Sequence, residues 1–150
     1  MAKRLIVQSP DPILFKKCRT VDTFDERLHV LLDDMKETLV DADGAGLAAP
    51  QVAVLKRVCV VSTEDGYYEL VNPEIKSASG EQTGIEGCLS VKGKYGTVTR
   101  AEKISVTAQD RYGKKHRYKL SGFTARAFQH EIDHLDGILY TSKCTDLQNE

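Results

Sequence analysis

The stretch "FTARAFQHEIDHL" (residues 123–135) predicts the helix on which the candidate chemistry of this protein lies. The helix is expected to begin near Gly122. Gly137 is expected to end it, because glycine readily adopts the left-handed backbone that follows many helices. A short apolar segment, "ILY", comes next.

Outward from this stretch, the clearest element is another helix, over about residues 24–42. Its apolar side chains recur at three- and four-residue steps and therefore share one face: Leu28, Leu31, Leu32, Met35 and Leu39. Thr23 and Glu26 match the capping box S/T-x-x-E, and Gly44 is expected to end the helix. The uncharged segment "GAGLAAPQ" (residues 44–51) follows directly.

The middle of the chain contains short runs of β-branched and aromatic residues, which predict strands: "RVCVVST", "YYELVNP" and "KISVTAQD". "RYGKKHRYKL" is expected to form the second arm of a hairpin that turns at Tyr112-Gly113. Strands in the middle and helices at either end, without regular βαβ alternation, predict an α+β fold with mostly antiparallel sheet. No repeat or linker divides the chain, so residues 1–150 are expected to form one domain.

The charge of the chain is balanced, with 21 basic and 22 acidic residues, so it indicates no specific nucleic acid and no membrane as a partner. A local basic excess between residues 92 and 119 is interpreted as a solvated hairpin face rather than an RNA-facing patch. Without a signal peptide or membrane-spanning segment, a cytoplasmic location is expected. The four cysteines form no CxxC pair, which argues against a disulfide framework.

The motif "HEIDH" places His130 and His134 four residues apart on the predicted helix. Their imidazole rings therefore project from the same face about one turn apart, where both can bind one metal ion. Glu131 adds a carboxylate that can reach a metal-bound water. The alternative is an ordinary helix whose histidines are satisfied by neighbouring groups.

A catalytic metal site of this kind needs a third protein ligand. Cys59 lies in the predicted strand "VCVV" and is expected to be a buried core thiol. Cys18 and Cys144 lie near the ends of the chain and are interpreted as incidental. Cys88 is favoured by its glycine neighbours in "GIEGCLS", which permit close approach, but an acidic ligand remains the rival.

Three segments, "GAGLAAPQ", "EGCLS" and "QHEIDH", together resemble the signature motifs of the peptide deformylase family in their order and separations. The resemblance extends from "SPDPIL" near the start to "HEIDHLDGILY" near the end. It implies antiparallel sheets around a central helix that carries HEIDH. It also implies hydrolysis of the N-formyl group from the formylmethionine of newly made polypeptides, with release of formate.

Site residues follow from the same resemblance. It implies one divalent ion with water in the fourth position and three protein ligands: Cys88, His130 and His134. It implies Glu131 as general base and acid, and the Gln51 side chain and the Leu89 N–H as donors to the oxyanion. Ligand softness alone suggests zinc. The resemblance instead implies an iron(II) enzyme, so Fe2+ is expected as the native ion, with Zn2+, Ni2+ or Co2+ as substitutes.

The resemblance also implies a binding mode in which the peptide adds a strand by backbone hydrogen bonds at Ala45, Gly46 and Gly87. The methionine pocket is expected to be built by Phe123, Ala127 and His130 and closed by Ile85 or its neighbour. Arg126 is interpreted either as an ion-paired or surface residue or as a substrate contact. The family pattern also implies an ion pair that supports the cysteine loop, between Glu86 and Arg100.

Two departures from the family pattern bear on these expectations. Lys92 in "SVKG" stands where the family often has proline, which is expected to alter the loop that leads to Tyr95. Some members also dock on the ribosome through a longer C-terminal helix. Only a short tail follows His134 here, so ribosome association is an open expectation.

Two other functions compete with deformylation. A zinc endopeptidase with the same HExxH would need a downstream acidic or histidine ligand and leaves "EGCLS" without a role. A paralogue with a structural metal would bind peptide N-termini without catalysis. Glu131 and Gln51 argue against that alternative, because a closed structural site needs neither.

Overall fold

The computed structural model describes residues 2–150. Its two α-helices are α1 (Glu26–Ala42) and α2 (Gly122–Leu135). A five-stranded sheet has the order β1-β2-β3-β6-β7, and a three-stranded sheet has the order β4-β5-β8. The bounds of the strands are β1 Gly46–Ala48, β2 Val58–Thr63, β3 Gly66–Ser79, β4 Gln82–Cys88, β5 Val91–Arg100, β6 Lys103–Gln109, β7 Lys115–Ser121 and β8 Gln148–Asn149. Short 3-10 helices occupy Pro12–Phe15, Ala49–Val52 and Tyr140–Ser142.

The larger sheet is packed between the two helices over β1 and β2. Successive side chains of a strand point to opposite faces. Val58 and Val60 accordingly pack with α1, whereas Cys59 and Val61 pack with α2. Cys59 is therefore a core thiol, as its sequence context predicts. The pairing within both sheets is antiparallel, so the predicted α+β fold with mostly antiparallel sheet is confirmed.

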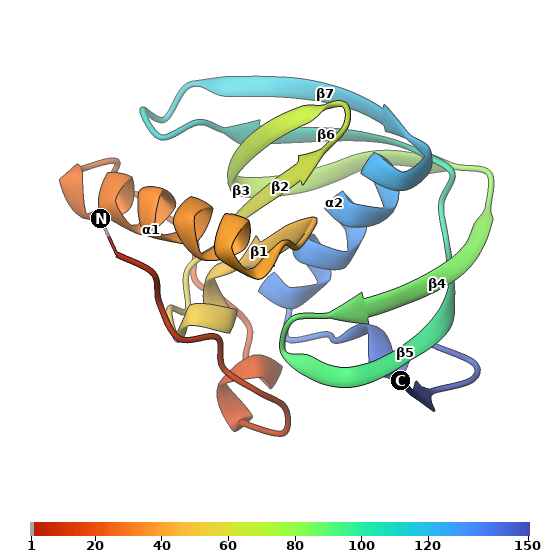
Figure 1. Cartoon of the computed structure of the whole chain (residues 1–150). Coiled ribbons are helices and arrows are strands. Elements are labelled where there is room, and N and C mark those ends of the chain that lie inside the picture. The colour runs from red at the N-terminus through yellow and green to blue at the C-terminus, as the bar shows by residue number, and fades with distance from the viewer. Residues whose placement is uncertain (1) are drawn as a thin grey trace.

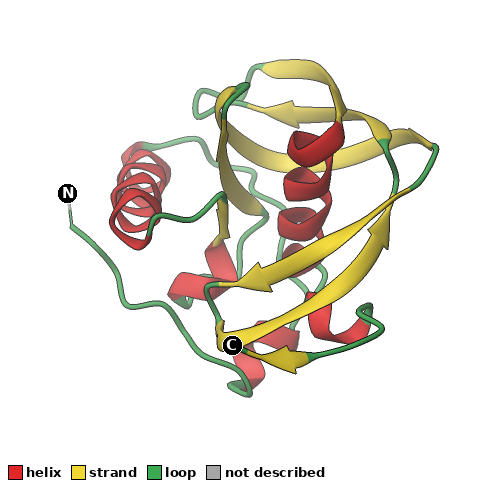
Figure 2. Ribbon diagram, turned by 45° about the vertical axis from the view of Figure 1, so that its right-hand side comes forward, coloured by secondary structure: helices red, strands yellow, loops and turns green. Residues whose placement is uncertain are grey.

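Helix α2 lies between the larger sheet and the β4–β5 pair, and both views of the chain show this central position (Figures 1 and 2). Its predicted start at Gly122 is confirmed. Gly137 follows the end of the helix with a φ of 75°, and its N–H donates to the carbonyl of His134 at 3.1 Å. This left-handed glycine ends the helix as expected. HEIDH is thus held on a helix that is covered on both sides.

The start of α1 differs from the prediction. The helix begins at Glu26, and the cap is Asp25, whose side chain accepts a hydrogen bond from the Leu28 N–H at 3.2 Å. The capping box expected from Thr23 is therefore wrong, because aspartate is at least as good a cap as threonine and stands nearer the helix. At the other end, Asp43 adopts the left-handed conformation, and the Gly44 N–H bonds to the Leu39 carbonyl at 3.3 Å.

The β6–β7 hairpin forms as predicted, with Gly113 in the turn at a φ of 86°. The β4–β5 hairpin was not predicted, because its glycines and lysines have low strand propensity. A register shift between Glu86 and Cys88 interrupts its pairing. Strand β4 is an edge of the smaller sheet, and β1 is an edge of the larger one. The two edges carry the segments "EGC" and "GLA" that border the candidate site.

Candidate active site

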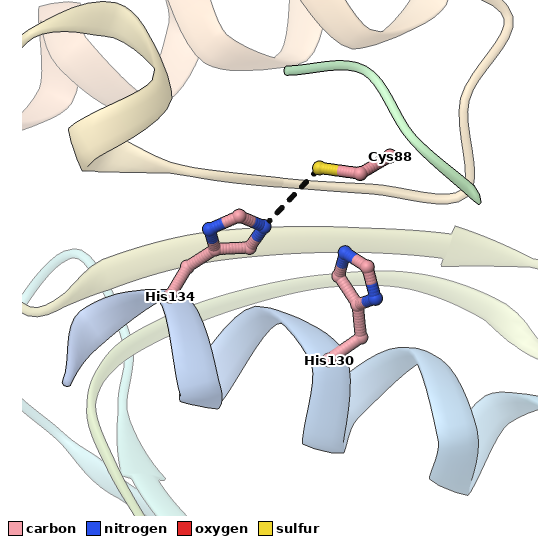
Figure 3. A group of neighbouring side chains, drawn as sticks. All are labelled: Cys88, His130 and His134. Atoms are coloured by element: carbon pink, nitrogen blue, oxygen red, sulfur yellow. Dashed lines mark hydrogen bonds between the residues drawn. The ribbon is translucent and has the colours of Figure 1, made fainter. Parts of the chain in front are cut away.

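Three side chains from two distant parts of the chain meet at the surface of α2: Cys88, His130 and His134 (Figure 3). Their ligand atoms all lie within 4.8 Å of one another. Cys88 Sγ and His134 Nε2 are 3.4 Å apart, the contact that is dashed in the figure. The third-ligand position that the motif leaves open is therefore next to a thiol, not next to a downstream acid.

The local backbone explains why the three groups converge. The two histidines share a face of α2 because they are four residues apart. Cys88 is the last residue of β4, directly after the register shift that follows Glu86. The Ser90 N–H donates to Cys88 Sγ at 3.4 Å, which holds the sulfur in the turn. One thiolate and two imidazoles at this separation suit a tetrahedral divalent ion with one open position.

Glu131 lies beside this cluster and is buried. Its Oε1 atom has no hydrogen-bond partner among residues 2–150, which marks it as a polar atom aimed at a group supplied from outside the chain. Burial raises the pKa of Glu131 to about 7, against the opposing effect of the nearby cations His130 and Arg100. A carboxyl group with such a pKa can both take up and release a proton near neutral pH.

Burial also decides the protonation of His134. It holds the pKa of this imidazole well below its ordinary value, so the ring is neutral at neutral pH. A neutral imidazole has the free electron pair that binding to a metal requires. His130 differs: although burial opposes it, Glu131, Cys88 and Glu86 raise its pKa to about 10 in the metal-free protein, so an ion that binds there displaces a proton. With that proton released, one thiolate and two imidazoles fit a divalent ion.

Gln51 is buried in the 3-10 helix Ala49–Val52, and its amide is held at both ends. Its Oε1 accepts from the Ala48 N–H at 2.9 Å. Its Nε2 donates to Ser90 Oγ at 3.0 Å and lies 3.6 Å from Cys88 Sγ. The oxygen is occupied by the backbone, so the NH2 group is the end directed toward the cysteine.

A buried network of charged side chains bonds to the Nδ1 atom of His130. Glu86 accepts from His130 Nδ1 at 2.8 Å and from Arg100 Nη2 at 2.9 Å, and it also pairs with Arg126. The ion pair between Glu86 and Arg100 is thus present. Despite the cost of burial, hydrogen bonds from His130 and Arg100 hold the pKa of Glu86 well below its usual range. The carboxylate fixes which nitrogen of His130 faces the cluster.

Arg126 belongs to this network and is buried, so the ion-paired interpretation of this residue holds. It also donates to the carbonyls of Val98 and Gln82, and so joins α2 to β5 and β4. Asp133 pairs with Arg100 at 3.0 Å and with Lys143 at 2.9 Å. Ser90 and Asp133 lie inside "EGCLS" and "HEIDH", but no role was expected for either. Their contacts, Ser90 with Gln51 and Asp133 with Arg100, join segments far apart in the sequence, which motif spacing does not predict.

A cavity of about 530 Å³ opens beside the cluster. Its lining includes Cys88, His130, Glu131, Gln51 and Leu89, together with the five residues expected to bind substrate: Ala45, Gly46, Gly87, Phe123 and Ala127. Ile85, expected to close the pocket, also lines it and is 68% exposed. The cavity further reaches four residues without an expected role: Val91, Gly93, Lys94 and Glu150.

The remaining cysteines lie apart from the metal-type cluster that the described residues form. Cys18 is buried, Cys144 is partly buried, and all four cysteines are free thiols. No helix within residues 2–150 has both the length and the apolar character that crossing a bilayer requires.

The fold and the site define a class of protein: an α+β enzyme in which a helical HExxH motif and a cysteine converge on one cavity. The sequence model of the family described as "Polypeptide deformylase" matches residues 3–150. Peptide deformylase 1 of Bacillus subtilis (strain 168) is 51% identical over 152 residues, which span all of this chain and 95% of the relative. Peptide deformylase of Caldicellulosiruptor bescii is 53% identical over 143 residues, 95% of this chain and 86% of the relative.

Solved structures agree with the sequence relatives. Peptide deformylase from Thermotoga maritima superposes with a TM-score of 0.93 at 36% identity and covers 96% of this chain and 99% of its own. The enzyme from Legionella pneumophila gives 0.92 at 45% identity, with 95% and 86% covered. This chain therefore belongs to the polypeptide deformylase family, and the enzyme class expected from its three motifs is confirmed.

Proposed function

We propose that this chain is one catalytic domain that removes the N-formyl group from the formylmethionine of newly made polypeptides and releases formate. The observation that carries the proposal is the cluster of Cys88, His130 and His134 beside a cavity that Cys88 and His130 line together with Glu131 and Gln51. The three ligands would hold one divalent ion. Such an ion supplies a nucleophile at neutral pH by lowering the pKa of its bound water.

Glu131 is proposed to move the proton in both halves of the reaction. It takes a proton from the attacking water and later gives it to the amine that leaves when the C–N bond breaks. Its unpartnered Oε1 and its pKa of about 7 support this role. Glu131 lines the same cavity as Cys88 and His130, which supports a role beside the site without counting it among the ligands.

Gln51 and the backbone N–H of Leu89 are proposed to stabilise the oxyanion that develops on the formyl oxygen. The amide of Gln51 is preorganised, because Ala48 and Ser90 hold its two ends. A donor that is fixed before the reaction needs no reorganisation while charge develops. The position of Leu89 directly after Cys88, in the lining of the same cavity, supports its part in the pair.

The substrate is proposed to lie extended between β1 and β4. Both are edge strands, so each has a free edge along the cavity, at Gly46 on one side and Gly87 on the other. Ala45 lines the same cavity directly before β1, and its carbonyl is already paired with the Ser62 N–H at 2.8 Å. Phe123 and Ala127 would receive the methionine side chain. Glu86 and Arg100 would keep His130 in position. A formylated nascent chain as the substrate also favours the expected cytoplasmic location.

Fe2+ is proposed as the native ion, and Zn2+, Ni2+ and Co2+ as substitutes. A thiolate ligand beside a redox-active ion predicts sensitivity to oxygen, because exposed thiolates are readily oxidised. Anaerobic purification should therefore preserve more iron and activity than aerobic purification. Equal iron and activity in both preparations would contradict the assignment of Fe2+.

The test of the function is formate release from a formyl-Met peptide by the iron-loaded protein, with Glu131→Gln as the control. Formate production that exceeds the Glu131→Gln variant by several orders of magnitude is expected. Rates that do not differ would refute the proposed reaction. Cys88→Ser tests the ligand set separately, since its metal content should fall; an unchanged metal content would remove Cys88 from the site.

A further inference from the structure

The cavity has an open, basic end beyond the proposed catalytic residues. Lys92, Gly93 and Lys94 line this end, and all three are exposed. None of the ion pairs that residues 2–150 form includes Lys92 or Lys94. Two ammonium groups without a partner therefore border the entrance to the site.

This basic end is a bulge of β5 that stands beside β4. Cys88 pairs with Val91 and Glu86 pairs with Gly96, so residues 92–95 are opposite the single residue Gly87. A Cβ atom on Gly87 would lie 3.5 Å from the carbonyl oxygen of Lys94. The bulge is thus in contact with the backbone along which the substrate is proposed to lie.

Strand β8 holds the bulge in place. It pairs Asn149 with Lys94 and Gln148 with Tyr95, and the Glu150 N–H donates to the Gly93 carbonyl at 2.8 Å. Glu150 also lines the cavity. The lining at this end thus includes the ammonium groups of Lys92 and Lys94 and the carboxylate of Glu150, and none of the ion pairs among residues 2–150 joins Glu150 to either lysine.

We propose that Lys92 and Lys94 make this enzyme select formylated peptides with an acidic residue at the second or third position. The inference rests on the proposed function, because it assigns a preference to the same site. With methionine between Phe123 and Ala127, an extended chain continues past Gly87 at about 3.3 Å per residue. The next two side chains then come within range of the basic end, where a carboxylate is attracted and an ammonium group repelled.

The test compares kcat/KM for six formylated tripeptides under the same conditions. Three carry Glu, Gln or Lys at the second position after formylmethionine and Ala at the third; three carry Ala at the second and Glu, Gln or Lys at the third. At low ionic strength we expect Glu to exceed Lys by about threefold to tenfold at one or both positions, the scale of exposed charge pairs. The ratio of kcat/KM for the Glu peptide to that for the Lys peptide should approach one in about 1 M salt, because the Debye length is then about 3 Å and the charges are screened.

Variants then test which residues cause the preference. In the double variant Lys92→Glu/Lys94→Glu, kcat/KM should become higher for the Lys peptides than for the Glu peptides. In Glu150→Gln, the preference for the Glu peptides should increase. The matched control is Lys103→Glu/Lys119→Glu, which makes the same charge change on exposed positions of β6 and β7, at the opposite end of the larger sheet from β1. The control should leave the ratio unchanged.

The outcomes separate this inference from the proposed function. If the Gln peptides are deformylated but Glu and Lys peptides react equally well, the charge preference is refuted and the function stands. If the double variant Lys92→Glu/Lys94→Glu still prefers the Glu peptides, or if the control variant changes the preference by the same factor, the assignment to these two lysines is refuted. If no peptide is deformylated, the proposed function and the inference both fail.

Discussion

Gly46 lies directly against the carboxylate of Glu131. A Cβ atom built on Gly46 would fall 2.5 Å from Oε2 of Glu131 and 2.8 Å from its Cδ. Side-chain atoms do not approach this closely, so the position admits glycine alone unless Glu131 moves. Gly46 therefore makes room for the side chain of Glu131, the proposed proton carrier, as well as for substrate. Strand β1 and helix α2 are in contact at this point.

Gly46→Ala should displace Glu131 and reduce kcat by about 10²-fold, since a shift of about 1 Å in a reacting group can have that effect. The metal content should not change, because the three atoms nearest to the added methyl group all belong to Glu131 and none to a proposed ligand. Gly44→Ala is the control: the added methyl group meets the flexible ends of Leu89 and Leu39, which can give way. A Gly46→Ala enzyme with normal kcat would show that the exact place of Glu131 is unimportant.

Substitutions of Gln51 separate the acceptor function of its side-chain oxygen from the donor function of its NH2 group. Gln51→Glu keeps an oxygen for the Ala48 N–H but removes the donor, whereas Gln51→Leu removes both. Both variants should lose about 10²–10³ in kcat, the effect of one oxyanion donor. Gln51→Leu should also lose about 1–3 kcal/mol of unfolding free energy, because the buried Ala48 N–H is then unpaired. Gln51→Glu keeps that hydrogen bond but should lose stability as well, because it buries a carboxylate beside Cys88. Urea unfolding beside steady-state kinetics would check this; full activity in either variant would contradict the donor role.

Glu86 should make the stability of the metal-free protein depend on acid pH. Its pKa in the folded protein is lowered from an ordinary value of 4.5. Below about pH 4.5 the unfolded chain therefore takes up a proton that the folded protein does not, and stability falls as the pH falls. At pH 7, Glu86→Gln should be about 3–5 kcal/mol less stable than the wild type, because Arg100 and Arg126 lose a buried partner.

The difference between Glu86→Gln and the wild type should narrow as the pH falls from 5 to 3.5, and urea unfolding with a chelator present would measure it. Glu64→Gln removes an exposed carboxylate and serves as the control, with little effect on stability at pH 7. A constant difference across this pH range would mean that the Glu86 carboxylate is not the group that titrates.

Tyr140 offers a substitution that should not destabilise the protein. Its ring stacks on His130 with centroids 6.0 Å apart, and it is buried, yet its hydroxyl has no hydrogen-bond partner in the described part of the chain. A buried unpaired polar group costs about 1–3 kcal/mol. Tyr140→Phe keeps the stacking and removes that cost, so it should be at least as stable as the wild type.

Urea unfolding would compare Tyr140→Phe with Tyr68→Phe, which loses a hydrogen bond from its hydroxyl to the Asp65 carbonyl. Tyr68→Phe should be slightly destabilised. If Tyr140→Phe loses more stability than Tyr68→Phe, the Tyr140 hydroxyl has a partner in solution.

Much of the fold could be predicted, because the elements with clear periodicity depend on local interactions. The apolar face of α1, the extent of α2 and the β6–β7 hairpin all follow from patterns a few residues long. The β4–β5 hairpin could not be predicted in this way. Its sequences "QTGIEGC" and "VKGKYGTVTR" are rich in glycine and lysine, so only pairing with each other, and the packing of Val98 into the core, make them strands.

In the site, local geometry was enough to place His130 and His134 together, because the turn of a helix brings residues four apart to the same face. Glu131 is three residues before His134 and is a neighbour of it on the helix surface for the same reason. The place of Cys88 depended on tertiary structure, since it requires β4 to run along α2 and the register to shift after Glu86. The same holds for the contact between Gly46 and Glu131 and for the lysines at the open end of the cavity. Spacing within a helix is set by its repeating backbone hydrogen bonds, whereas contacts between distant segments exist only once the chain has packed.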